Sequence, residues 1–139
     1  MSNIMIVYWS GTGNTEAMAQ AIADGVSAAG QTAVCCSVDE ADATAVLASD
    51  KIAFGCPAMG AEELEEDSFE PFFAGLENQL KGKKVALFGS YGWGDGEWMR
   101  TWADRTRADG AQLLDDGLIQ NGEADVEACQ AYGQSLAAF

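Results

Sequence analysis

The stretch that decides the fold is Ile4-Met5-Ile6-Val7-Tyr8-Trp9-Ser10-Gly11-Thr12-Gly13-Asn14-Thr15. An apolar run typical of a strand leads into a turn of glycine, hydroxyl and amide residues, and helical spacing begins directly after it. This order forms a phosphate cradle, because free N–H groups at a helix N-terminus bind anions. The turn lacks basic residues and the Gly-Lys-Ser/Thr of a P-loop. It is therefore predicted to bind, with neutral donors, a phosphate that is not being transferred.

A simpler interpretation of residues 10–15 is an ordinary helix cap, which needs a single Ser, Thr, Asp or Asn. The turn instead has four hydroxyl or amide side chains in six residues, namely Ser10, Thr12, Asn14 and Thr15. This excess over what a cap requires favours a ligand.

Length and composition predict one globular domain over residues 1–139. The chain has 139 residues and is 48% hydrophobic, so one core buries enough apolar surface and disorder is not expected. No run approaches the ~20 apolar residues that cross a membrane. The first strand begins too early to leave room for a signal peptide. We therefore expect a cytoplasmic location.

The charge is strongly negative and unevenly distributed. Twenty-two acids against 7 bases give a net charge of −15, which argues against nucleic acid or anionic membranes as partners and favours a basic partner. No Lys or Arg precedes Lys51. Residues 62–70 contain six acids and no base, namely Glu62, Glu63, Glu65, Glu66, Asp67 and Glu70. This run is either a solvated surface or a docking surface, and its density favours docking.

The four cysteines do not have metal-site spacing. They are Cys35, Cys36, Cys56 and Cys129. Without a C-x-x-C pair or any His, zinc sites and His-based catalysis are not expected. We interpret these cysteines as buried thiols of a cytosolic protein.

Apolar, β-rich runs alternate with segments of helical spacing along the chain. Strands are predicted at 4–9, 32–38, 51–56, 84–90 and 111–118, and helices at 14–29, 42–48, 69–80, 97–108 and 124–138. This alternation predicts an α/β fold in which helices cover both faces of a five-stranded parallel sheet. Trp98 and Trp102 share one face of a predicted helix, so they are expected in the core.

Ligands of such sheets bind beyond the carboxyl ends of the strands. Four predicted strands are followed by the segments 10–15, 57–62, 91–96 and 119–122. The first segment offers phosphate donors, the second has Met59 beside Gly60, and the third has Trp93 between two glycines. Trp93 could also be a core aromatic, but its two glycine neighbours, which have no side chains, favour a ligand-facing loop. Together the segments predict a flat aromatic ligand with a phosphate tail.

Three segments resemble the short-chain flavodoxins. They are Tyr8 to Thr15, Ala58-Met59-Gly60 with Glu62, and Ala86 to Gly96. The likeness covers essentially the whole chain, and the fifth predicted strand runs directly into its loop, as in the short-chain group. It implies a doubly wound, flavodoxin-like sheet of order 2-1-3-4-5 with tightly bound, non-covalent FMN. Flavodoxins are themselves an example of ligand binding beyond the carboxyl ends of the strands. The FMN position is therefore implied by the resemblance and is not an independent result.

The resemblance also implies which residues contact FMN. Phosphate would be held by the turn Ser10, Gly11, Thr12, Gly13, Asn14 and Thr15. Met59 and Trp93 would cover the two ring faces, Gly60 would present a carbonyl near N5, and Glu62 would accept a hydrogen bond from N3. Ser90, Tyr91 and Gly92 would line the ring and the ribityl chain. The remaining implied contacts are Ala58, Ala61, Gly94, Asp95 and Asn121.

The implied function is low-potential, one-electron transfer in which FMN cycles between semiquinone and hydroquinone. Acids near the ring, such as Glu62, Glu63 and Asp95, disfavour the anionic, fully reduced flavin. Gly60 can flip its peptide, because positive φ is open to glycine, and its carbonyl would then accept a hydrogen bond from N5–H of the semiquinone. Ala61 stands where the family pattern has an acid or an amide. The equilibrium between the two orientations of the Gly60 peptide is therefore expected to differ from that of the family.

Redox proteins with basic docking surfaces are the expected partners, and the chain is expected to be a monomer without metal, nucleic acid or membrane insertion. Two alternatives remain open. One is a flavin-dependent quinone or NAD(P)H reductase on the same fold, which the lack of His and the few Arg residues disfavour. The other is a non-redox FMN-binding module.

Overall fold

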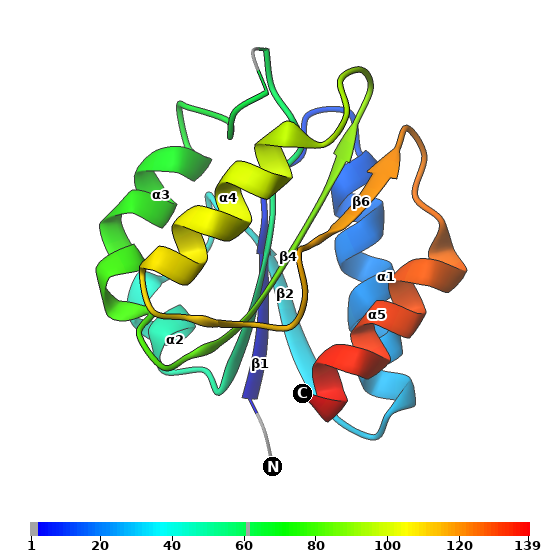
Figure 1. The fold of residues 1–139 in the computed structure, drawn as a ribbon. Coiled ribbons are helices and arrows are strands. Elements are labelled where there is room, and N and C mark those ends of the chain that lie inside the picture. Colours follow the sequence, from blue (N-terminus) through cyan, green and yellow to red (C-terminus); the bar gives the residue numbers. More distant parts are fainter. Residues whose placement is uncertain (1–2, 61) are drawn as a thin grey trace.

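A parallel β-sheet forms the centre of the molecule in the computed structural model, which describes residues 3–60 and 62–139 (Figure 1). Its strands are β1 (Asn3–Tyr8), β2 (Thr32–Ser37), β3 (Lys51–Gly55), β4 (Lys84–Tyr91), β5 (Gln112–Leu113) and β6 (Leu118–Asn121). The order is β2-β1-β3-β4-β5, with β6 also paired to β4. All five pairings are parallel. The predicted doubly wound order is confirmed.

Helices cover both faces of the sheet, as predicted. The helices are α1 (Asn14–Ala28), α2 (Ala43–Leu47), α3 (Phe69–Leu76), α4 (Glu97–Ala108) and α5 (Val126–Ala138), with a short 3-10 turn η1 (Glu77–Gln79) after α3. α1 and α5 lie on one face, and α2, α3 and α4 lie on the other (Figure 1). No helix in the described ranges is long and apolar enough to cross a membrane.

Alternation along the buried strands divides the core into two clusters. In β3, Ile52 and Phe54 face the α2–α3–α4 layer, whereas Ala53 faces α1 and α5. Trp98 and Trp102 are each 1% exposed in the first cluster, which confirms their predicted place in the core. Because side chains point alternately to the two faces of a strand, a continuous apolar run supplies both clusters.

The fifth predicted strand, 111–118, is wrong as a single element. β5 ends at Leu113, and pairing to β4 resumes only at Leu118 as β6. Between them a turn forms in which Asp115 Oδ1 accepts hydrogen bonds from Gly117 N–H (2.8 Å) and the Tyr132 hydroxyl (2.9 Å). Gly117 has φ 106°, which breaks the strand. Residues 119–121, predicted as a loop, therefore belong to β6.

Burial of the cysteines agrees only partly with the prediction. Cys56 and Cys129 are buried, but Cys35 and Cys36 are half-buried. Both half-buried thiols lie on β2, which pairs with a neighbour on one side only. Burial, the neighbouring Cys36 and Glu16 raise the pKa of the Cys35 thiol to about 11, so it is a poor nucleophile at neutral pH.

Candidate functional site

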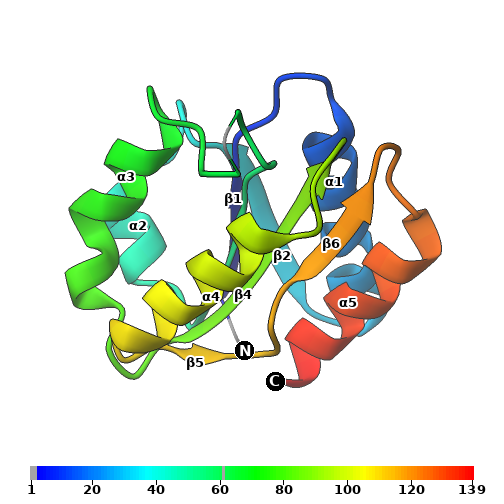
Figure 2. The same ribbon diagram turned by 45° about the horizontal axis from the view of Figure 1, so that its top comes forward.

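Three loops meet beyond the carboxyl ends of β1, β3 and β4, at the end of the sheet that Figure 2 turns toward the reader. They enclose a hollow of about 260 Å³. The lining residues are Trp9, Gly11, Thr12, Asn14, Pro57, Ala58, Met59, Ser90, Tyr91, Gly92 and Gly122. The hollow therefore joins the three segments that sequence reasoning singled out.

The first loop presents backbone donors at the start of α1. Gly13 adopts φ 95° directly before the helix, and Ser10 Oγ accepts hydrogen bonds from Gly13 N–H (3.1 Å) and Glu16 N–H (3.2 Å). Within residues 3–60 and 62–139, the N–H groups of Gly11, Thr12, Asn14 and Thr15 make no hydrogen bond. Unpaired donors at a helix N-terminus are suited to an anion.

A buried hydrogen bond ties this turn to the end of β4. Thr15 Oγ1 and Ser90 Oγ lie 2.9 Å apart, and the two residues are only 1% and 5% exposed. Both residues belong to regular elements. Thr15 lies in the first turn of α1, and Ser90 lies near the end of β4, where it pairs with β6. The first loop and the end of β4, from which the third loop continues, are thus fixed relative to each other.

The second loop contains a tight turn that two backbone hydrogen bonds close. Met59 N–H donates to Glu63 O (2.9 Å), and Glu63 N–H donates to Met59 O (3.1 Å). Gly60 and Glu62 both have positive φ, 44° and 57°. Positive φ is uncommon for a residue other than glycine, which marks Glu62 as a strained position of functional interest. The predicted site residue Ala61 lies outside the described residues.

The Glu62 carboxylate joins the second loop to the third. It accepts hydrogen bonds from Asp95 N–H (3.2 Å) and from Trp98 N–H (3.0 Å) at the start of α4. A Cβ on Gly94 would overlap this carboxylate unless the Glu62 side chain moved, and the φ of 88° at Gly94 itself favours glycine. Glu62 was predicted to face N3 of the flavin; in this structure both of its oxygens bind the backbone before and within α4.

Several predicted residues lie at the rim of the hollow instead of in its wall. Trp93 is 67% exposed at the tip of the third loop. Asp95 is exposed and forms an ion pair with Arg100 (3.0 Å). Asn121 pairs with Tyr91 as the last residue of β6. Trp93 and Asn121 are each next in sequence to a residue that lines the hollow, Gly92 and Gly122.

Three residues of the wall were not predicted as individual cofactor contacts, namely Trp9, Pro57 and Gly122. Trp9 directly follows β1, and its indole lies so close to Gly11 that a Cβ there would be 2.9 Å from the ring. Each missed residue follows a strand end next to a residue that was singled out. Pro57 and Gly122 lie within the predicted loop segments 57–62 and 119–122, whereas Trp9 was predicted as the last residue of the first strand.

Comparison with known proteins identifies the family. The model of the flavodoxin family matches residues 6–133. Flavodoxin from Megasphaera elsdenii is 47% identical over 134 residues, which cover 96% of this chain and 98% of that protein. Flavodoxin from Clostridium beijerinckii is 45% identical, with 95% and 97% covered. The chain belongs to the flavodoxin family.

Solved structures agree with this assignment. The solution structure of two-electron reduced Megasphaera elsdenii flavodoxin superposes with a TM-score of 0.89 at 48% identity, covering 98% of this chain and 99% of that one. This flavodoxin is accordingly an FMN-dependent electron carrier and not a stand-alone catalyst. The comparisons favour neither the reductase nor the non-redox module.

The residues of the hollow fit FMN. The N–H groups of Gly11, Thr12, Asn14 and Thr15, unpaired among the described residues, suit a phosphate. The apolar wall of Trp9, Met59 and Tyr91 suits a flat ring. Of the residues that the structure describes, those lining the hollow include no Lys or Arg. A bound phosphate would therefore be held by the helix dipole and neutral donors.

Proposed function

We propose that this flavodoxin is a low-potential carrier that moves one electron at a time, its FMN alternating between the half-reduced and fully reduced forms. The hollow at the carboxyl ends of β1, β3 and β4 is the observation that supports this most. It places anion donors without a cation beside an apolar, acid-rimmed cleft. We further propose that residues 1–139 act as a single domain, that the chain is a monomer, and that its four free cysteines fit a cytoplasmic location.

In this proposal, the turn from Ser10 to Thr15 holds the phosphate. Ala58 and Met59 of the second loop, together with Gly60 to Glu62, hold one side of the ring. Ser90 to Asp95 hold its other side, and Asn121 supports Tyr91 from β6. Trp93 is already at the rim, so the bound ring would cover part of its exposed surface.

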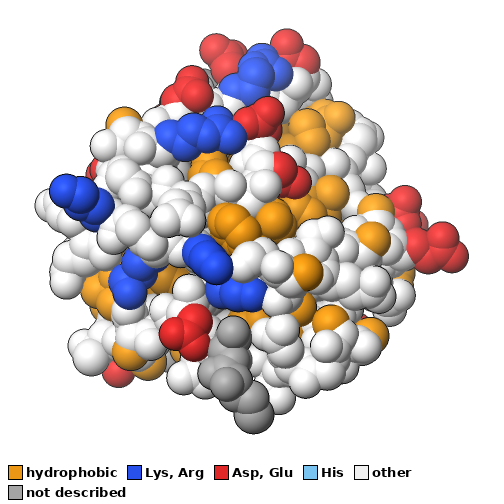
Figure 3. Space-filling model, turned by 60° about the horizontal axis from the view of Figure 1, so that its bottom comes forward, with side chains coloured by type: hydrophobic (Ala, Val, Ile, Leu, Met, Phe, Trp, Pro, Cys, Tyr) orange, Lys and Arg blue, Asp and Glu red, His pale blue; other side chains and the backbone are white. Residues whose placement is uncertain are grey.

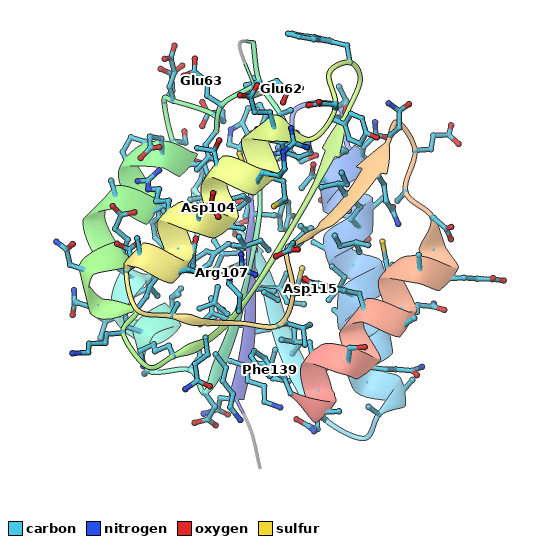
Figure 4. All side chains as sticks on the ribbon, in the orientation of Figure 1. Glu62, Glu63, Asp104, Arg107, Asp115 and Phe139 are labelled. Atoms are coloured by element: carbon cyan, nitrogen blue, oxygen red, sulfur yellow. The ribbon has the colours of Figure 1, made fainter. Side chains whose placement is uncertain are left out.

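The charge distribution supports a low potential. Two lysines lie far from the hollow at the amino ends of the strands, where Lys51 Nζ donates to Ala137 O (2.6 Å) and Lys84 Nζ to Phe139 O (2.8 Å). Figure 4 shows Phe139 at this end and Glu62 and Glu63 at the other. Because each acid at ~10 Å costs an added negative charge roughly 1.7 kcal/mol at an effective dielectric of ~20, the fully reduced anion is disfavoured.

Figure 3 shows the end opposite the hollow, where Lys and Arg side chains gather. The exposed acids Glu63, Glu66 and Asp67 and the Lys and Arg side chains at the far end (Figure 3) give the molecule a polarity, although Arg100 lies beside the third loop, paired with Asp95. In the field of a basic partner, this polarity would turn the flavin edge toward that partner and would speed association.

The proposed docking surface is smaller than the acidic run suggested. Glu63, Glu66 and Asp67 are exposed, whereas Glu65 is 6% exposed. Glu70 is bound by Arg105, whose guanidinium nitrogens lie 2.6 and 2.8 Å from its carboxylate. We therefore assign docking to Glu63, Glu66 and Asp67, with Glu65 and Glu70 serving the fold.

An amide-resolved NMR titration of the FMN-free protein with FMN tests the proposed site. The largest shift changes are expected in residues 10–15, 58–60, 62–63 and 90–95, because these amides belong to the three loops that enclose the hollow. A second hollow of about 310 Å³ lies between β2 and α2 and includes Thr32, Val34 and Ala45. Largest changes there instead would contradict the assignment.

A further inference from the structure

One acid of the run 62–70 behaves unlike its neighbours. Glu65 is 6% exposed, although Glu66 and Asp67 beside it are exposed. An unpaired buried carboxylate is costly, so its partners explain why it is there. Among the described residues, the partners of the Glu65 carboxylate are backbone N–H groups of its own chain.

The Glu65 carboxylate receives three backbone hydrogen bonds before and at the start of α3. Its Oε2 accepts from Asp67 N–H (2.9 Å), and its Oε1 accepts from Ser68 N–H and Phe69 N–H (both 2.8 Å). Ser68, the residue before α3, provides no side-chain cap. Glu65 therefore fulfils the capping role from three residues upstream.

Glu65 is also bound to the strand that leads into the second loop. Its N–H donates to Cys56 Sγ (3.3 Å), and Cys56 directly follows β3 and is fully buried. Residues 57–64 thus form a loop whose two ends are joined at the Cys56–Glu65 contact. The Met59–Glu63 turn, with its two closing hydrogen bonds, lies inside this loop.

On the α3 side, a donor to the Glu65 carboxylate is packed into the core. Phe69, which donates to the carboxylate, is fully buried, and its ring packs edge-on against Trp102 with centroids 5.4 Å apart. Leu64, next to Glu65, is also buried. Glu65 therefore links the segment that carries the Met59–Glu63 turn to the packed α3–α4 layer.

We propose that Glu65 is a positioning residue for the flavin, whose charged carboxylate fixes the Met59–Glu63 turn to α3 so that this wall of the hollow is formed before the cofactor binds. The inference rests on the proposed assignment of that turn to the flavin. A preformed wall lowers the entropy that the turn would otherwise lose when a ligand binds. Glu65 itself does not line the hollow, so it acts through the turn.

The charge of Glu65 suits this role. Burial alone raises the pKa of Glu65, but hydrogen bonds from Phe69, Ser68 and Asp67 N–H outweigh it and hold the pKa below its usual range. The side chain is then ionised at neutral pH and can accept all three bonds. A glutamine there would turn its NH₂ group toward at least one N–H donor.

Glu65→Gln in the full-length protein tests the proposal, with Glu66→Gln as the matched control that removes the same charge from an exposed neighbour. In the FMN-free protein, hydrogen exchange at Met59 and Glu63 N–H is expected to speed up about tenfold or more in Glu65→Gln, the effect of losing a charged hydrogen bond. FMN affinity is expected to fall about tenfold as well. Glu66→Gln is expected to change both by less than about twofold.

Exchange at Met59 and Glu63 that matches the control would overturn the positioning role. Faster exchange with control-like FMN affinity would overturn its cofactor part. Glu65→Asp serves if Glu65→Gln does not fold, because it keeps the charge but shortens the side chain. It is expected to speed hydrogen exchange at Met59 and Glu63 N–H, and unchanged exchange in this variant would count against the proposal. A wild-type chain that binds no FMN would instead refute the proposed function, because the exchange measurement needs no cofactor.

Discussion

Replacing Gly133 by alanine is expected to destabilise the fold by about 1–3 kcal/mol, although alanine is the better helix former by about 1 kcal/mol. Gly133 lies on α5 where this helix crosses α1. A Cβ there would overlap the Ile22 carbonyl oxygen and would lie 3.0 Å from Val26 N. Because these are backbone atoms, they cannot rotate away as a side chain would. The two helices must move apart, and the loss of packing outweighs the gain in propensity.

Gly75→Ala is the matched control, since Gly75 lies within α3 and a Cβ there meets nothing within 4 Å. It is expected to stabilise the protein by up to about 1 kcal/mol. Urea unfolding of both variants without FMN, followed by circular dichroism, measures the two effects. If Gly133→Ala were as stable as Gly75→Ala, the close backbone contact between α1 and α5 would not exist.

Replacing Ser10 by alanine is expected to weaken FMN binding by about 10–100-fold while leaving riboflavin binding nearly unchanged. Ser10 Oγ orders the turn through Gly13 N–H and Glu16 N–H and is a proposed phosphate donor. A hydrogen bond to a charged group contributes about 1.5–3 kcal/mol, and each 1.4 kcal/mol is tenfold in affinity. Riboflavin has no phosphate, so it does not sense this loss. Quenching of flavin fluorescence measures both affinities.

Ser27→Ala, an exposed change further along α1, controls for the substitution itself and is expected to leave both affinities unchanged. An equal loss of FMN and riboflavin in Ser10→Ala would mean that the turn shapes the ring site and does not hold the phosphate. The ratio of the two affinities therefore reports on the phosphate alone.

The sequence predicted the sheet because its signals are local. The buried runs of β1, β3 and β4, the stop at Gly30 with φ 84°, and the helices between them are each readable within about fifteen residues. The split between β5 and β6 was missed. It depends on Asp115 meeting the hydroxyl of Tyr132, 17 residues away, although Asp115-Asp116-Gly117 carried a turn signal.

The loops of the site were predicted for the same reason, because each directly follows a strand. What the sequence could not show is which acids are free. Glu65 and Glu66 are chemically identical neighbours, yet one caps α3 and the other faces solvent. Likewise, the joining of the second and third loops by Glu62 depends on residues 33 and 36 positions away.

The most direct test of one-electron transfer on FMN is an anaerobic dithionite titration of the FMN-loaded protein, followed by its visible spectrum. Two separate steps are predicted, with the long-wavelength absorbance of half-reduced flavin rising to a maximum and then falling as the second electron is added. Free FMN, which lacks the Met59–Glu63 turn and the acidic rim, is the reference. A single two-electron bleaching without half-reduced flavin, like that reference, would contradict the proposed one-electron function.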